Sequence, residues 1–170
     1  QPAAVIIKHT NPCGVGVGND LFEAFSKALS ADSVSAFGGI VALNTEVDES
    51  TAKDLTKLFL ECVVAPKFSQ KAIEILSSKS NLRLLELNPK AIMSSDNQQI
   101  RSILGGALIQ ELDNKASDPS LWKTVTDRKP TERQKDDLRF AWNVVKHVRS
   151  NAILVAKGGK TIGIGAGQMN

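Results

Sequence analysis

Two adjacent side chains, Lys8 and His9, are the residues of this chain best suited to chemistry. They follow the short apolar run 3–7 and stand directly before a stretch rich in proline and glycine. An imidazole can accept or donate a proton near neutral pH, and a neighbouring ammonium can stabilise a developing negative charge. The pair therefore indicates acid–base chemistry on a polarised substrate.

Three features favour a functional role for this pair over simple solvation of two polar residues at a strand end. Ligands of open α/β sheets collect beyond the carboxyl ends of the strands. The glycine-rich stretch, which we expect to be a loop, permits a close approach of its backbone, and it leads to a helix N-terminus at Asp20. Because consecutive side chains of a strand point to opposite faces, we expect residues 10–12 to bend the pair toward one pocket.

Other chemistries fit the sequence less well. Nucleobase deaminases need three zinc ligands and a glutamate in the pattern H-x-E…P-C-x-x-C, but no glutamate follows His9 at that spacing and residue 16 is glycine. Nothing in the sequence favours a thiolate at Cys13, so we interpret it as a small loop residue. The stretch GGKT at 158–161 lies between two expected strands rather than before a helix, so it is not a phosphate loop. We expect no metal site.

Composition indicates one soluble globular domain. Of the 170 residues, 42% are hydrophobic and 23% are charged, and no apolar run approaches the ~20 residues that cross a bilayer. The net charge of +3 is mild and the basic residues are scattered, which argues against nucleic-acid binding. Two cysteines without a secretory signal predict reduced thiols and a cytoplasmic location.

Strand and helix patterns alternate along the first half of the chain. Helices are expected to begin after the N-cap residues Asp20, Asp48, Ser69 and Thr131. Strands are expected at 3–7, 39–43, 62–65 and 82–87, with a hairpin at 151–156 and 161–164 and some strand within 100–112. This rhythm predicts an α/β fold with a mostly parallel mixed sheet and helices on its faces.

Four longer segments carry a family resemblance. They are KHTNPCG (8–14), ADSVSAFGGIVALN (31–44), ECVVAPKFS (61–69) and KHVRSNAILVAKGGKTIGIGAGQM (146–169). In this order they resemble the transformylase part of the AICAR transformylase/IMP cyclohydrolase family, and only residues 88–130 resemble it weakly. The resemblance implies a cytidine-deaminase-like three-layer α/β/α sandwich without zinc. It also implies that residues 1–170 form a single domain, the first transformylase subdomain, without the IMP cyclohydrolase domain or the second transformylase subdomain.

The resemblance also implies a reaction, in which a formyl group passes from 10-formyltetrahydrofolate to the 5-amino group of AICAR. That amine is conjugated with an imidazole ring, so it needs a base to accept its proton. His9 matches the family's catalytic histidine and would be this base. Lys8 matches the neighbouring lysine and would stabilise the oxyanion or keep His9 neutral. Asn151 matches an asparagine that forms a hydrogen bond in the active site.

Further positions match the family's substrate and folate pocket. They are Asn11, Phe37, Gly38 and Glu61, the last as a carboxylate for the donor nitrogens of the pterin. The resemblance implies a homodimer whose active site draws on two protomers, and it leaves open a monovalent cation near the site. We expect the isolated chain to have little or no activity. The alternative is a non-catalytic module that keeps the fold for oligomerisation or ligand binding.

Overall fold

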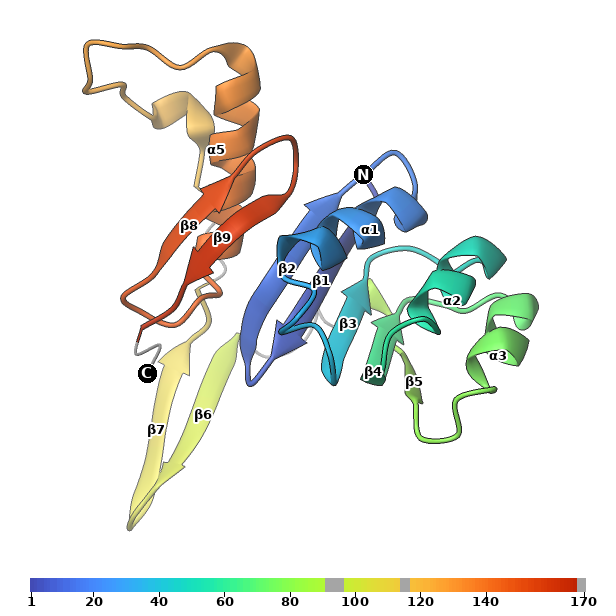
Figure 1. Ribbon diagram of the computed structural model, residues 1–170. Helices are drawn as coiled ribbons and strands as arrows, with labels where there is room; N and C mark the ends of the chain where they lie inside the picture. Colours follow the sequence, from blue (N-terminus) through green and yellow to red (C-terminus); the bar gives the residue numbers. More distant parts are fainter. Residues whose placement is uncertain (91–96, 114–116, 168–170) are drawn as a thin grey trace.

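The computed structural model describes residues 1–90, 97–113 and 117–167. Its central unit is a five-stranded mixed sheet in the order β2-β1-β3-β4-β5, which three helices accompany (Figure 1). The strands are β1 (Ala3–Lys8), β2 (Asn11–Val17), β3 (Gly39–Leu43), β4 (Leu60–Ala65) and β5 (Arg83–Glu86). The helices are α1 (Leu21–Ala31), α2 (Glu49–Leu55) and α3 (Gln70–Leu76). The predicted α/β class with a mixed sheet is confirmed: β3, β4 and β5 are parallel, and β1 is antiparallel to both of its neighbours.

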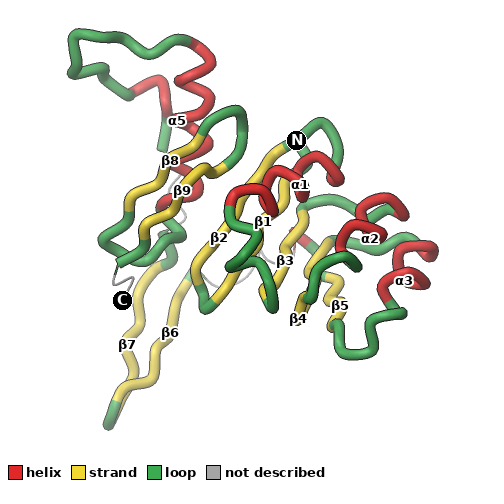
Figure 2. Tube along the Cα trace, in the orientation of Figure 1, coloured by secondary structure: helices red, strands yellow, loops and turns green. Residues whose placement is uncertain are grey.

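The second half of the chain forms hairpins and one long helix. Its elements are β6 (Gln98–Ile103), β7 (Gly106–Glu111), the short helix η1 (Pro119–Leu121), α5 (Glu132–Val145), β8 (Ile153–Ala156) and β9 (Thr161–Gly165). The β6–β7 hairpin extends away from the five-stranded sheet (Figure 2). The β8–β9 hairpin instead joins the sheet at β2, because the Val17 amide donates to the Gly159 carbonyl at 2.8 Å and the Val15 amide to Thr161 Oγ1 at 3.0 Å.

The stretch expected to be a loop after His9 is a strand, so that expectation is wrong. β2 pairs antiparallel with β1 from Asn11 to Val17. Its glycines serve packing: a Cβ at Gly14 would lie 2.1 Å from the Ala28 carbonyl oxygen, and one at Gly16 would lie 2.5 Å from the Ala24 carbonyl oxygen. Without side chains at these positions, the backbone of α1 lies directly on β2.

All four expected helix starts are confirmed. The side chains of Asp20, Asp48, Ser69 and Thr131 each accept a hydrogen bond from the backbone amide three residues further on. Such a cap satisfies one of the amides that the first turn leaves unpaired, and it stabilises a helix by about 1 kcal/mol. Helix α5 is only partly buried, since Val144 is buried whereas Leu138 and Trp142 are about half exposed.

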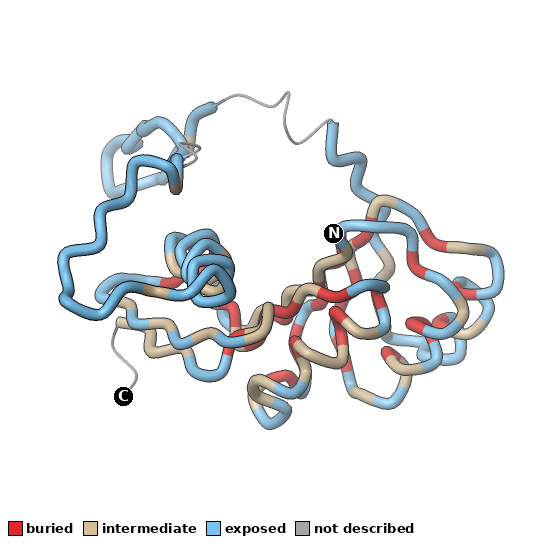
Figure 3. The backbone as a smooth tube through the Cα atoms, turned by 90° about the horizontal axis from the view of Figure 1, so that it is seen from above, coloured by how far each residue is buried: buried red, intermediate tan, exposed pale blue. Residues whose placement is uncertain are grey.

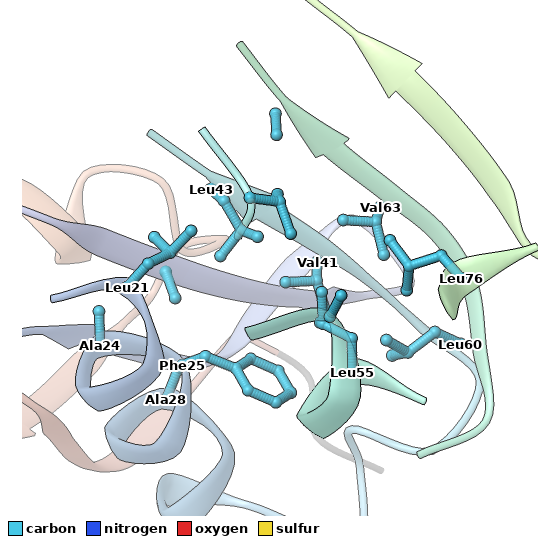
Figure 4. Packing of buried hydrophobic residues seen from close by; sticks show 14 of the residues in the cluster. Leu21, Ala24, Phe25, Ala28, Val41, Leu43, Leu55, Leu60, Val63 and Leu76 are labelled. Atoms are coloured by element: carbon cyan, nitrogen blue, oxygen red, sulfur yellow. The ribbon is translucent and has the colours of Figure 1, made fainter. Parts of the chain in front are cut away.

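The hydrophobic core lies between one face of the sheet and helices α1 to α3 (Figure 4). Val41 is the centre of a row across the sheet, because it pairs with Ile6 of β1 and Val63 of β4. These three side chains are fully buried, and they cluster with Phe25 of α1 and Leu55 of α2. Burial is concentrated in this unit, whereas the described part of 97–139 is exposed along almost its whole length (Figure 3).

The opposite face of the sheet is apolar and open among the described residues. Register places Ile7 beside Ile40, and Ala42 between Val5 and Val64. Ile40 is 39% exposed. Leu85 of β5, which pairs with Val64, is 54% exposed. Helices α1 to α3 therefore cover one face of the sheet and form one helical layer of the expected sandwich.

Replacing Gly14 with alanine should lower the free energy of unfolding by about 1–3 kcal/mol, because the new Cβ would collide with the backbone of α1. Gly163→Ala is the matched control, since nothing lies within 4 Å of its Cβ position, and it should change stability by less than about 0.5 kcal/mol. Urea unfolding followed by circular dichroism measures both. Equal stability of the two variants would contradict this account of β2.

Candidate functional site

The Lys8–His9 pair lies at a two-residue turn that joins β1 to β2. Lys8 pairs with Asn11, so the turn residues are His9 and Thr10, with φ values of 50° and 66°. Two-residue hairpins favour such turns because their twist matches that of the strands, but asparagine and glycine normally occupy them. A β-branched threonine at positive φ is a rare exception that costs about 1–3 kcal/mol. Surrounding contacts must therefore hold this turn.

The turn falls one residue earlier than the sequence suggested. Residues 10–12 were expected to bend the pair, but Asn11 and Pro12 already belong to β2. His9 is exposed at the tip of the hairpin, and Lys8 is half-buried at the end of β1. The two side chains therefore belong to different parts of one turn, with the imidazole open to a ligand.

The ammonium of Lys8 is held by the loop that precedes β3. Lys8 Nζ donates a hydrogen bond to the carbonyl of Phe37. A Cβ at Gly38 would lie 3.4 Å from Lys8 Nζ and 3.6 Å from Phe59 Cε1, and Gly38 has a φ of 67°. Glycine therefore suits this position because of its backbone conformation. The rings of Phe37 and Phe59 pack at a centroid distance of 5.2 Å and form an aromatic wall beside the ammonium.

The segment after α5 reaches the same turn from the far end of the chain. The Arg149 amide donates to Asn11 Oδ1 at 3.0 Å, and Arg149 Nη2 donates to Thr10 Oγ1 at 2.8 Å. Asn151 follows two residues later and is exposed. The structure thus brings the segment that carries Asn151 to the hairpin that carries His9, across 138 positions of sequence.

Glu61 is engaged elsewhere. Its Oε2 lies 3.0 Å from Arg83 Nη1, in an ion pair between β4 and β5. Both side chains are exposed, so the pair contributes at most about 1 kcal/mol. The carboxylate is therefore directed toward the β5 side of the sheet and away from the hairpin turn.

The site does not lie where the general rule for open sheets suggested. β1 runs antiparallel to β3, so the carboxyl end of β1 meets the amino ends of β3, β4 and β5. Helix α1 begins after β2 has run back along the sheet, so its N-terminus lies at the opposite end from His9. The pair lies at the carboxyl end of its own strand as expected, but at the amino ends of the parallel strands, and the expectation of a nearby helix N-terminus is wrong. A hairpin turn and two loop segments build the site instead.

Two clefts lie among the described residues, and neither His9 nor Thr10 lines them. One of about 310 Å³ opens between residues 56–60 and 78–82, and Phe59 lines it. Because Phe59 also packs on Phe37, this cleft adjoins the aromatic wall next to Lys8. A larger one of about 1370 Å³ lies between α5, β8 and the segment 119–131, and none of the candidate site residues lines it.

Neither metal nor thiol chemistry is supported at this site. Within the described ranges, no group of three or more histidine, cysteine or acidic side chains could hold a metal ion. Burial, and secondarily the charge of Asp32, raise the pKa of the Cys13 thiol, and burial also raises the pKa of Cys62. Both residues are free thiols that favour the protonated, unreactive form.

Sequence reasoning missed Thr10, Arg149 and Phe59. Thr10 gave no signal because the strand after it was interpreted as a loop. Arg149 gave none because its two contacts bridge positions far apart in the chain, which no local pattern reveals. Phe59 lies between α2 and β4, and its packing on Phe37 depends on tertiary structure that no local pattern reveals.

The protein is therefore of the mixed α/β class, and its candidate functional site is a polar hairpin turn. The family model described as AICARFT/IMPCHase bienzyme matches residues 1–170. The chain belongs to this family. No helix among the described residues is long and apolar enough to span a membrane.

Curated relatives match the whole chain. The bifunctional purine biosynthesis protein PurH of Synechococcus sp. (strain CC9311) is 59% identical over 170 residues, which cover 100% of this chain and 32% of the relative. PurH of Prochlorococcus marinus (strain MIT 9211) is 60% identical over 170 residues and is covered to 33%. The chain therefore spans about a third of the length of these relatives. Among solved structures, the apo dCMP deaminase of the cyanophage S-TIM5 is similar to this chain with a TM-score of 0.42 and 10% sequence identity. The similarity covers 51% of this chain and 79% of the deaminase, and it is too weak to support an inference.

The raised pKa of the Cys13 thiol leads to a test of its reactivity. A raised pKa lowers the thiolate fraction near neutral pH, so alkylation by iodoacetamide should be much slower in the folded chain than in urea. The rate should rise only as the pH passes above the usual range of a free thiol. Mass spectrometry of the tryptic peptide measures this rate. Fast labelling of folded protein near neutral pH would show an activated thiol and contradict the assignment.

Proposed function

We propose that residues 1–170 are the first transformylase subdomain of a purine biosynthesis enzyme. In this proposal, the complete enzyme transfers a formyl group from 10-formyltetrahydrofolate to the 5-amino group of AICAR. The observation that carries the proposal is the contact between the segment of Asn151 and the Lys8–His9 turn, in a chain that matches the family from end to end. Hydrogen bonds of Arg149 thus connect two segments that the family resemblance marks separately in sequence, which supports the proposal.

His9 is the proposed general base. As the amine nitrogen attacks the formyl carbon, a C–N bond forms, the carbonyl oxygen becomes an oxyanion and the nitrogen must lose a proton. The exposed imidazole of His9 accepts that proton, directly or through the substrate's carboxamide. Collapse of the tetrahedral carbon then breaks its bond to N10 of the folate, which takes up a proton as it leaves.

Lys8 is the proposed electrostatic partner. Its ammonium has three N–H donors, and the Phe37 carbonyl accepts from it. The remaining donors are free to stabilise the oxyanion, and tethering to Phe37 reduces the reorganisation needed at the moment of reaction. Gly38 allows the loop to adopt a positive φ beside this ammonium.

The other matched residues have proposed binding roles. Asn11 Oδ1 is occupied by the Arg149 amide, so its amide group remains as a donor for substrate. Asn151 is exposed and follows two residues after Arg149, which contacts the turn, and its side-chain amide offers both a donor and an acceptor. Phe37 is 58% exposed and offers an aromatic face to a planar ring. Glu61 would recognise the pterin only by giving up its ion pair with Arg83, so its role depends on a rearrangement of that pair.

The proposed site is completed outside residues 1–170, by other parts of the protein and by a partner protomer in a homodimer. Two features support this: His9 and Asn151 are exposed, and the sheet face that carries Ile40 and Leu85 is apolar and open among the described residues. Apolar faces of this kind mark surfaces that bind another part of a protein. We therefore expect little or no turnover by residues 1–170 alone. The cytoplasmic location and a bound monovalent cation stay predictions.

A non-catalytic role is the alternative, and one observation favours it: His9, Lys8 and Asn151 line neither of the two clefts described above. The two functions differ in what the full-length protein binds. We define the full-length chimaera as PurH of Synechococcus sp. (strain CC9311) in which this chain replaces the matching 170 residues. Calorimetry that shows neither AICAR nor folate binding to the full-length chimaera would favour the non-catalytic module.

His9→Ala in the full-length chimaera should lower the transformylase kcat by at least about 100-fold, because a positioned general base contributes that much. The matched control is His147→Ala, which removes the other histidine of the chain, a residue just beyond α5 whose backbone amide donates to the Val144 carbonyl. This control should leave kcat unchanged. Steady-state assays with saturating folate and AICAR measure both variants. A loss of less than about tenfold for His9→Ala would be too small for a general base.

A further inference from the structure

The direction of the His9 side chain depends on a turn that the local sequence does not favour. Neither His9 nor Thr10 is a glycine or an asparagine, yet both have positive φ. A hairpin with these residues would readily adopt other turns unless contacts from elsewhere select this one. Any contact that selects the turn also selects where the imidazole points.

A relay of hydrogen bonds reaches the turn from Arg149. The guanidinium donates to Thr10 Oγ1 at 2.8 Å, and Thr10 Oγ1 donates to the His9 carbonyl at 2.6 Å. The hydroxyl of Thr10 is thus used as acceptor and donor at once, which fixes both its rotamer and the peptide plane that follows His9. Loss of either bond frees that peptide plane to rotate.

The backbone of Arg149 is itself anchored on both sides. Its amide donates to Asn11 Oδ1 at 3.0 Å, and its carbonyl accepts from the Gly167 amide at 2.8 Å. A Cβ at Gly167 would lie 1.9 Å from the Ser150 carbonyl oxygen, so the two segments touch with no space for a side chain. The backbone that carries the guanidinium is therefore held in place by hydrogen bonds on both sides.

The guanidinium is not used for an ion pair. Among the described residues, no carboxylate lies within salt-bridge distance of Arg149, whereas Arg83 and Arg139 each have such a partner. Its bond to a neutral hydroxyl at the turn is the side-chain contact that distinguishes it. This use of arginine suggests a role in the geometry of the turn rather than in electrostatic stability.

We propose that Arg149 is a positioning residue for His9 and that it acts through the hydroxyl of Thr10. The proposal rests on the proposed function, in which His9 is the general base. Because proton transfer depends steeply on geometry, a small rotation of the imidazole lowers the rate of the chemical step. Substrate binding through Lys8, Phe37 and Asn151 should be little affected.

The test is a double-mutant cycle in the full-length chimaera with Arg149→Ala, Thr10→Val and both together. Each single variant should lower kcat by about tenfold and leave KM for AICAR and for the folate within about twofold. The double variant should be no worse than either single one, because both remove the same relay. Arg139→Ala, which removes an exposed arginine of α5 that pairs with Asp136, is the matched control and should leave kcat unchanged.

Conservative variants separate positioning from loss of structure. Thr10→Ser keeps the hydroxyl and should retain kcat within about twofold, and Arg149→Lys keeps a donor and should recover most of the loss. Thermal unfolding of every variant is measured alongside. If Thr10→Val misfolds, Thr10→Ser takes its place in the cycle. Arg149→Ala should then lower kcat by the same factor in the Thr10→Ser background as in the parent.

Two results would overturn the inference. Additive losses in the double variant would show that Arg149 and Thr10 act separately. An increase in KM for AICAR with kcat unchanged would show that Arg149 binds the anionic substrate directly. Neither result affects the proposed function, which fails on a different observation: a His9→Ala variant that keeps its transformylase rate within about tenfold.

Discussion

The antiparallel pairing of β1 with β2 is the constraint on which the site depends. Pairing of Lys8 with Asn11 leaves only two residues for the turn and forces both into positive φ. This register is fixed several residues away, where the bare backbone at Gly14 lies against α1. A shift by one residue would place a side chain against the helix backbone. The core thus determines a strained turn at its edge, and the turn presents the imidazole.

Three segments far apart in the chain supply different groups to this edge. The hairpin turn carries His9, the loop after α1 holds the Lys8 ammonium through the Phe37 carbonyl, and the segment after α5 brings Arg149 and Asn151. Two of these segments are placed by β2, because α1 packs on its glycines and β9 begins against its outer edge. One small strand therefore positions two of the three segments that form the candidate site.

Local features of the fold could be predicted from sequence, because their causes are local. The N-caps at Asp20 and Thr131 mark helix starts through a bond to an amide three residues on, and the structure confirms them. The strand β2 was missed because its glycines resemble a loop, although they are needed for contact with α1. The meeting of Arg149 with Thr10 depends on tertiary packing across 139 positions, so it could not be found in one sequence. The Lys8–His9 pair stood out from its residue types and its place after an apolar run, whereas Asn151 was proposed only because its segment resembles a family.

The central claim is that an imidazole and an ammonium from consecutive residues converge on one acceptor amine. A crystal structure of the full-length chimaera with bound AICAR tests it most directly. The account predicts that a His9 ring nitrogen lies within hydrogen-bond distance, about 2.6–3.2 Å, of the 5-amino nitrogen or of the carboxamide beside it. Lys8 Nζ should point to the side from which the formyl oxygen approaches. A structure in which AICAR binds far from the hairpin turn, with His9 still solvated, would contradict the account.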